Sequence, residues 1–316
     1  MSDETPVVAR GLVKRYGEIV AVAGVDLTVE RGDVFGYLGP NGAGKTTSLR
    51  MLLGLIRPTS GTSRLFGRDP IDDGARALEG VAGFVEGPRF YPYLSGRRNL
   101  RLLADYDEPT TRSRIDEVLE LVELRDRAKD RVGGYSHGMR QRLGIAASLL
   151  RSPRLLLLDE PATGLDPAGM RDMRDLVRRL AGEGITILLS SHLLYEVEEL
   201  CNRVAIIRKG SIVYQGALGE LLATAATSYR LKTREPERAR ALCLNQRGLE
   251  NVVADGDELR FSADEDAVAT LSVALGQARI PILQLTTDTA SLEDLFLGMT
   301  DGESSDHDRP AALAAS

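Results

Sequence analysis

The sequence contains no tryptophan, and its 316 residues include only two cysteines, three histidines and 5% aromatic residues. Cys201 and Cys243 are far apart and have no metal-ligand spacing, which indicates two reduced thiols and neither a disulfide framework nor a metal centre. No apolar run approaches the roughly 20 residues that are needed to span a bilayer. The first residues, MSDETPVVAR, lack the basic and then apolar pattern of a signal peptide. If the protein works at a membrane, we expect another chain to cross it.

Basic residues are also too few to give an excess of positive charge. Lysine and arginine together number 40, and aspartate and glutamate 46, which gives a net charge of −6 and an isoelectric point near 5.4. A general nucleic-acid-binding protein has the opposite balance, so we expect no nucleic-acid partner. Hydrophobic residues make up 43% of the chain and charged residues 27%, which suits a soluble protein with one large or two modest domains.

Apolar patterns divide the first two thirds of the chain into strands and helices. Short alternating runs over residues 7–30 predict antiparallel strands. Residues 33–39, 154–159 and 185–191 are predicted to form buried strands, and the second of them is an uninterrupted apolar run closed by acids. Their alternation with helical patterns predicts a parallel sheet covered by helices. Residues 94–150 are predicted to be mainly helical.

Local signals set two helix boundaries in this region. The helix that follows residues 39–46 is expected to end at Pro58. Ser113, with Asp116 three residues later, is expected to cap the N-terminus of the next helical segment. A stripe of apolar residues in that segment predicts core packing, and it consists of Ile115, Val118, Leu119 and Val122.

The last third of the chain has a different pattern. After about Ala217 the order is strand, helix, hairpin, helix and strand, which predicts a ferredoxin-like split unit with a further short helix. The sequence beyond residue 300 is acidic and then rich in alanine, so residues 301–316 are predicted to form a disordered tail. We therefore expect one domain over residues 1–218, with a helical subdomain at about 87–150, and a second domain over 226–300.

The segment GPNGAGKT fits the phosphate-loop pattern G-x-x-x-x-G-K-[ST]. Its glycines allow backbone N–H groups to surround phosphate oxygens, and the helix that follows directs its positive end at them. Lys45 is predicted to neutralise the β- and γ-phosphates of ATP, and Thr46 to bind Mg²⁺. A chance glycine-rich turn is the alternative, and the strand before and helix after the segment argue against it. The predicted nucleotide contacts are Gly39, Pro40, Asn41, Gly42, Ala43, Gly44, Lys45, Thr46 and Thr47.

Three polar residues follow the other two buried strands. Asp159 ends the second strand and is predicted to bind Mg²⁺, and Glu160 is predicted to accept a proton from the attacking water. His192 closes the third strand, where it can hold water and the γ-phosphate in register. Solvated acids and a capping histidine are the alternatives. Ligands gather at the carboxyl ends of parallel strands, which favours the catalytic interpretation.

In this order the motifs resemble those of the nucleotide-binding subunit of ATP-binding cassette (ABC) transporters, over about residues 7–216. YSHGMRQR, residues 135–142, lies where that family has its LSGGQ-like signature, and TGLD, residues 163–166, resembles the loop after the catalytic acid. The resemblance implies a P-loop NTPase fold of the ABC type, with a parallel-sheet core, an antiparallel β subdomain and a helical subdomain. It also implies nucleotide contacts at Tyr16, Ser136, His137, Gly138 and Asp166.

The signature is implied to act across a dimer. Ser136 and the backbone of Gly138 stand at a helix start, which is an anion site. In the family this site closes on the γ-phosphate held by another subunit, so that two ATP molecules lie between two head-to-tail domains. With one phosphate loop per chain, we expect a homodimer or a related second subunit. His137 replaces the family's usual glycine, and the sequence does not decide whether it touches ATP.

Two further segments are similar to drug-resistance and antimicrobial-peptide transporters. The end of the chain, SLEDLFLGMT, resembles the extension of daunorubicin-type exporters, and FVEGPRFYPYLSGRRNL resembles bacitracin and lantibiotic self-protection transporters. Most of the superfamily has glutamine where Glu86 stands. The resemblance implies that Glu86 reaches Mg²⁺ and the attacking water from the loop that leads to the helical subdomain. We interpret it as a metal-linked coupling residue and not as a second general base.

These features predict an ATP-hydrolysing subunit that powers an exporter of a drug, antibiotic or antimicrobial peptide. Separately encoded permease subunits would hold it at the cytoplasmic face of the membrane. Export of lipid, polysaccharide or ions is an alternative, and a soluble ABC ATPase acting on ribosomes or DNA is another. The single cassette and the acidic balance disfavour the soluble ATPase. A binding module with an inactive site has little support, because Lys45, Asp159, Glu160 and His192 are all present.

Overall fold

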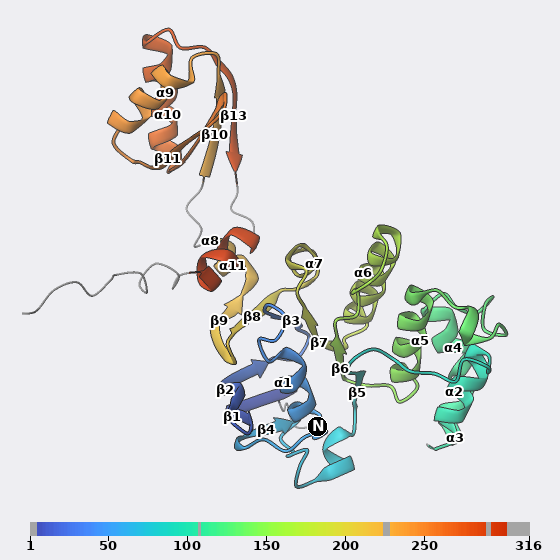
Figure 1. Cartoon of the computed structure of the whole chain (residues 1–316). Helices are drawn as coiled ribbons and strands as arrows, with labels where there is room; N and C mark the ends of the chain where they lie inside the picture. The colour runs from blue at the N-terminus through green and yellow to red at the C-terminus, as the bar shows by residue number, and fades with distance from the viewer. Residues whose placement is uncertain (1–4, 107–108, 224–227, 289–291, 302–316) are drawn as a thin grey trace, which may run out of the picture. The chain divides into compact units, whose positions relative to one another are not determined.

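The computed structural model describes residues 5–106, 109–223, 228–288 and 292–301, arranged in two compact units that divide between Leu218 and Gly219 (Figure 1). The predicted disordered tail lies outside the described residues except for Asp301, which ends the last helix. In the described part, no helix has both the length and the apolar composition needed to cross a bilayer.

A six-stranded sheet forms the centre of the first unit, in the order β5-β6-β7-β3-β8-β9. Five neighbouring strands are parallel and β9 is antiparallel at one edge. Every residue of β3, β6 and β7 is buried, which explains the apolar runs within them at residues 34–38, 155–158 and 187–189. The strands are β3 (Val34–Leu38), β5 (Val81–Phe84), β6 (Leu155–Asp159), β7 (Thr186–Ser191), β8 (Arg203–Arg208) and β9 (Ser211–Ala217).

A second, antiparallel sheet has the order β2-β1-β4. Helix α1 (Lys45–Leu52) contacts all three of its strands and also β6, so its buried residues join the two sheets in one apolar cluster. Leu49, Met51 and Leu52 are the α1 residues in that cluster. The three strands are β1 (Val7–Tyr16), β2 (Ile19–Val29) and β4 (Ser60–Leu65).

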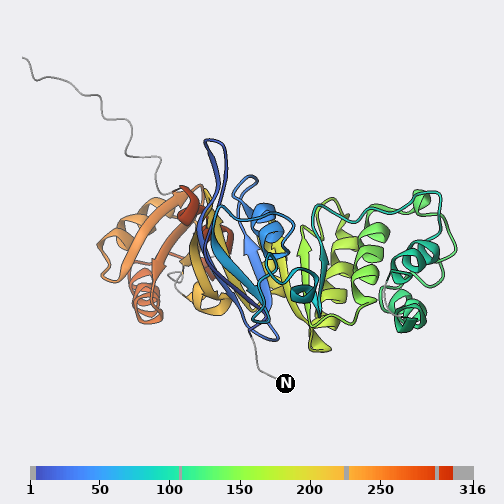
Figure 2. The same cartoon turned by 90° about the horizontal axis from the view of Figure 1, so that it is seen from below.

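Helices α2 to α5 gather at the opposite end of the first unit from the antiparallel sheet (Figures 1 and 2). Gly144 of α5 packs directly on the loop after β5, because a Cβ at this position would lie 2.6 Å from the ring of Pro88. The described part of the first unit also contains the short 3₁₀ helices η1 (Gly74–Leu78) and η2 (Val132–Gly134). Its remaining α-helices are α2 (Gly96–Ala104), α3 (Pro109–Ser113), α4 (Ile115–Leu121), α5 (His137–Leu149), α6 (Pro167–Gly182) and α7 (Leu194–Leu200).

Two predicted helix boundaries are wrong. Helix α1 ends at Leu52 and not at Pro58, because Gly54 adopts a φ of +69° and the N–H groups of Gly54 and Leu55 donate to carbonyl groups of the last turn. Ser113 is the last residue of α3, and the N-cap position of α4 is occupied by Arg114, whose side chain makes no capping hydrogen bond. The apolar stripe predicted in α4 is confirmed, since its four residues are buried.

The second unit is the predicted ferredoxin-like arrangement. Its four antiparallel strands have the order β11-β12-β10-β13, and two helices lie between them in sequence. Tyr229 and Phe261 stack in its core with ring centroids 5.9 Å apart. The elements are α8 (Leu218–Ala223), which crosses the division, β10 (Ser228–Thr233), α9 (Pro236–Asn245), β11 (Leu249–Asp255), β12 (Glu258–Ala263), α10 (Glu265–Gln277), β13 (Ile282–Asp288) and α11 (Leu292–Asp301).

Gly83 provides a test of how closely β5 and β6 approach. Its φ is +151°, and a Cβ there would lie 1.9 Å from the carbonyl oxygen of Leu157. We expect Gly83→Ala to lower the free energy of unfolding by about 2–3 kcal/mol, because the backbone of a buried strand must move. Chemical denaturation measures this. The matched control is Gly182→Ala, where a Cβ meets nothing within 4 Å. Equal stabilities of the two variants would contradict the close approach.

Candidate functional site

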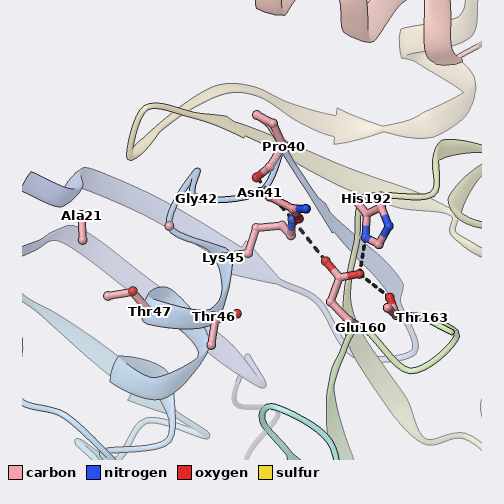
Figure 3. Close-up of a pocket in the computed structure, with 11 residues that line it drawn as sticks. Ala21, Pro40, Asn41, Gly42, Lys45, Thr46, Thr47, Glu160, Thr163 and His192 are labelled. Carbon is pink, nitrogen blue, oxygen red and sulfur yellow. Dashed lines mark hydrogen bonds and ion pairs between the residues drawn. The ribbon is translucent and has the colours of Figure 1, made fainter. Parts of the chain in front are cut away.

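The predicted phosphate loop connects β3 to α1 and forms one wall of a cavity of about 350 Å³ (Figure 3). Residues from the ends of β6 and β7 form the facing wall. Two predicted contacts, Gly39 and Ala43, are not among the lining residues. The lining consists of Ala21, Pro40, Asn41, Gly42, Gly44, Lys45, Thr46, Thr47, Glu160, Thr163 and His192.

The loop conformation depends on glycine. Gly42 and Gly44 have φ values of +81° and +107°, which residues with a side chain rarely adopt. At Gly44 a Cβ would also lie 2.5 Å from the carbonyl oxygen of Ala21 on β2. The loop therefore turns sharply into α1, and the unpaired N–H groups of the first helical turn lie beside the cavity.

Lys45 crosses the cavity from the first position of α1. Its side chain is only 6% exposed, and Nζ donates a hydrogen bond of 2.7 Å to the carbonyl oxygen of Gly39. Nζ also lies 3.2 Å from Oε1 of Glu160, which is the ion pair drawn in Figure 3. A buried ammonium group requires polar partners, and Lys45 finds them in Gly39 and Glu160. Its side chain therefore connects the phosphate loop to the end of β6.

Asp159 is buried and receives hydrogen bonds from three separate segments. Its Oδ2 accepts from Thr46 Oγ1 at 3.0 Å and from the Glu86 N–H at 3.3 Å, and its Oδ1 accepts from Ser190 Oγ at 2.5 Å. In the described part, no group of three or more His, Cys, Asp or Glu side chains is placed to hold a metal ion alone. Thr46 and Asp159 nevertheless fit Mg²⁺, which typically uses one or two protein oxygens and completes its shell with phosphate and water.

Glu160 follows directly and has a φ of +52°, which is unusual for a residue with a side chain. Its N–H donates to the hydroxyl and carbonyl oxygens of Ser190, which holds this conformation. Its Oε2 accepts a 2.8 Å hydrogen bond from Thr163 Oγ1 and lies 2.5 Å from His192 Nδ1. The carboxylate thus lies between lysine, threonine and histidine at the edge of the cavity (Figure 3).

These contacts keep Glu160 ionised. Burial by itself raises the pKa of its carboxyl group, but the Thr163 hydrogen bond, the charge of Lys45 and the contacts with His192 together lower that pKa below its ordinary value. An ionised carboxylate in contact with a histidine can accept a proton from water and pass it on.

Sequence reasoning missed two residues of this cluster. The sequence indicates only that Thr163 lies in the loop after Glu160 and that Ser190 belongs to a strand. The only signal for Ser190 was a polar side chain in a buried strand, two positions before His192. For Thr163 the sequence carried no signal, because the sharp turn at Glu160 brings the two side chains together.

Glu86 reaches the site through its backbone. Its N–H binds Asp159, whereas its carboxylate forms an ion pair with Arg50 of α1 and is more than half exposed. Its φ of +66° is also in the left-handed region. Glu86 is therefore adjacent to the Thr46 and Asp159 pair, with its side chain turned to Arg50.

The other predicted nucleotide contacts lie outside the cavity of this chain. Tyr16 ends β1 with 48% of its surface exposed, and Lys14 Nζ lies 5.1 Å from its ring. Ser136 caps α5 by accepting from the Met139 N–H, and Asp166 caps α6 by accepting from the Gly169 N–H. His137 Nε2 lies 3.0 Å from the carbonyl oxygen of Thr163. Gly138, in the first turn of α5, is half-buried.

Comparison with known proteins gives the family. Residues 22–163 match the family model described as ABC transporter. The uncharacterized ABC transporter ATP-binding protein YhcH of Bacillus subtilis is 41% identical over 87% of this chain and 90% of that protein. The bacitracin transport ATP-binding protein BcrA of Bacillus licheniformis is 38% identical over 92% and 96%. The daunorubicin/doxorubicin resistance ATP-binding protein DrrA of Streptomyces peucetius is 36% identical over 92% and 91%.

A solved structure of the ATP-binding subunit of an ABC transporter is similar with a TM-score of 0.62 and 28% identity, over 70% of this chain and 93% of that one. The chain belongs to the ATP-binding subunits of ABC transporters, which are ATPases. The predicted fold is confirmed, with its parallel core, antiparallel sheet, helical region and ferredoxin-like unit.

The lowered pKa of Glu160 predicts a pH dependence of stability. Because the folded-state pKa lies below the ordinary value of 4.5, ionised Glu160 stabilises the fold at neutral pH, and this contribution is lost as the pH falls through the folded-state pKa. We expect the difference in unfolding free energy between the parent and Glu160→Gln to be constant above about pH 6 and to decrease below 4.5. Urea titrations across this range measure it. A pH-independent difference would contradict the lowered pKa.

Proposed function

We propose that the chain binds and hydrolyses Mg²⁺-ATP in the cavity beside Lys45, and that hydrolysis powers a membrane exporter. The observation that carries the proposal is the position of Glu160, whose carboxylate contacts Lys45, Thr163 and His192 at the wall facing the phosphate loop. A base held by three partners opposite a phosphate-binding loop is suited to activating water for attack on the γ-phosphate.

Each residue of the cavity then has a defined task. The loop N–H groups and Lys45 bind the β- and γ-phosphates, and phosphate oxygens replace Glu160 as partners of the ammonium group. That exchange leaves Glu160 with Thr163 and His192, so the carboxylate becomes available to a water molecule. Thr46 and Asp159 would hold Mg²⁺, which would supply positive charge to balance that of the phosphate oxygens. His192 orients the water and the phosphate.

ATP-binding subunits of ABC transporters dimerise and work with transmembrane subunits. For this chain we propose a head-to-tail homodimer in which Ser136 and Gly138 of one copy face the γ-phosphate held by the other. Tyr16, exposed at the end of β1, would stack on adenine. Asp166 would approach the shared interface from the start of α6.

A groove of about 370 Å³ between β5, α2 and α5 is suited to the permease. Pro88 and Phe90, directly after Glu86, line it, and so do the exposed side chains of Leu103 and Tyr106. We propose that a segment of a separately encoded permease docks here and holds the chain at the cytoplasmic face of the membrane. Movement of Glu86 would then be transmitted to that segment.

The relatives support a substrate class. BcrA is named for bacitracin transport and DrrA for resistance to daunorubicin and doxorubicin, and both match more than nine tenths of this chain. We propose that the exported compound is a drug, an antibiotic or an antimicrobial peptide. Loss of resistance to one such compound on deleting the gene, with wild-type sensitivity to unrelated toxins, tests this.

Dimerisation can be tested with Glu160→Gln, which we expect to block hydrolysis and to leave ATP binding intact. We expect this variant to change from monomer to dimer when ATP and Mg²⁺ are added, because two bound nucleotides complete the interface. Light scattering coupled to size exclusion measures the mass. Lys45→Ala in the same background is the control and should remain monomeric. A monomeric Glu160→Gln at saturating ATP would count against the head-to-tail arrangement.

The roles of Glu86 and Glu160 are separable. With the permease present, we expect Glu160→Gln to lower ATP turnover by at least about 100-fold, as loss of a general base does. Glu86→Gln should lower it by less than about tenfold and weaken the affinity for Mg²⁺, because an amide keeps the reach but loses the charge. Steady-state ATPase assays over a range of Mg²⁺ concentrations compare them. Equal inactivation with unchanged metal affinity would refute the coupling role.

A further inference from the structure

His137 lies in the first turn of α5, between the cap residue Ser136 and Gly138. It does not line the nucleotide cavity of its own chain. Its Nε2 lies 3.0 Å from the main-chain oxygen of Thr163. A carbonyl oxygen can only accept a hydrogen bond, so Nε2 carries the proton and donates it. This contact fixes the tautomer and the direction of the ring.

The buried side chain of Gln141, one helical turn later, supports this assignment. Its Nε2 lies 3.4 Å from His137 Nε2, and its Oε1 has no hydrogen-bond partner in the described part of the chain. Two donors cannot face each other, and the oxygen and nitrogen of an amide are assigned from their hydrogen-bond partners. With the amide reversed, Oε1 accepts from the imidazole N–H. The same Nε2–H is then shared between the oxygens of Thr163 and Gln141, at 3.0 and 3.4 Å.

Thr163 connects the imidazole to the catalytic acid. Its main-chain oxygen accepts from His137, and its hydroxyl donates to Glu160 Oε2 at 2.8 Å. The first turn of α5 also packs on the two residues that follow. A Cβ at Gly164 would lie 3.6 Å from the ring, and one at Gly138 would lie 3.5 Å from Leu165. The signature helix and the loop after Glu160 are thus in contact within one chain.

We infer that His137 is a positioning residue for Glu160 of its own chain, acting through Thr163. The inference rests on the proposed head-to-tail dimer. In that dimer, Ser136 and Gly138 face the nucleotide held by the partner, whereas Glu160 serves the nucleotide held by its own phosphate loop. His137 therefore acts on a different nucleotide from the one that its neighbours in the signature contact.

The alternative role is a direct contact of His137 with the partner's nucleotide, and the two roles predict defects at opposite sites. His137→Phe keeps a ring of similar shape but removes the donor to Thr163. His137→Gln keeps a donor of similar reach. A loss of turnover in the first variant that the second restores is therefore assigned to the hydrogen bond and not to the bulk of the ring.

Mixed dimers of full-length chains with two different affinity tags separate the sites. In the first dimer, one chain carries His137→Phe and its partner carries Glu160→Gln, so the remaining active Glu160 lies in the chain with the altered signature. In the second dimer, one chain carries both substitutions and its partner is unmodified, so the active Glu160 faces an altered signature across the interface. A dimer of one unmodified chain and one Glu160→Gln chain is the reference.

We expect the first mixed dimer to turn over ATP about threefold to tenfold more slowly than the reference, the loss expected for one hydrogen bond, and the second to match the reference. In homodimers, His137→Phe should lower kcat and leave KM for ATP unchanged, and His137→Gln should restore kcat. A slower second dimer with a normal first dimer would overturn the inference and assign His137 to the partner's nucleotide. Equal rates in all three dimers would also overturn it. An unmodified chain without ATPase activity would instead refute the proposed function.

Discussion

The geometry of the site depends on the hydrogen bonds that the carboxylate of Asp159 accepts. This carboxylate is buried at the end of β6, where an ionised group must be matched by donors, and three segments supply them. The donors are Thr46 at the start of α1, Glu86 in the loop that leads to the helical region, and Ser190 in β7. One side chain therefore connects the three segments.

The strained backbone at Glu160 depends on the same contacts. Ser190 binds Asp159 through its hydroxyl hydrogen and accepts the N–H of Glu160 with its oxygens, so one serine fixes both acids. The positive φ turns the Glu160 side chain toward Lys45, while Asp159 faces Thr46. Two consecutive acids therefore receive different partners. This is why Asp159 is suited to binding a metal ion and Glu160 is suited to accepting a proton.

Local sequence rules worked where the chemistry is local. The phosphate loop requires glycine at fixed positions and a following helix, and residues 39–47 show both. Pro58 and Ser113 misled because a glycine signal at position 54 ended α1 first, and because the chain around Arg114 turns without a side-chain cap. The structure also joins Glu86 to Arg50, 36 positions earlier in the chain, and no periodicity links those two.

The sequence by itself determined the fold class and the residue types at the ends of β3, β6 and β7, because a buried parallel strand needs an uninterrupted apolar run and its polar residues must follow it. Only the tertiary structure decided which of these residues touch. The contacts of Thr163 with Glu160 and of His137 with Thr163 depend on a left-handed turn and on the packing of α5 against the following loop. The order of residues along the chain specifies neither that turn nor that packing.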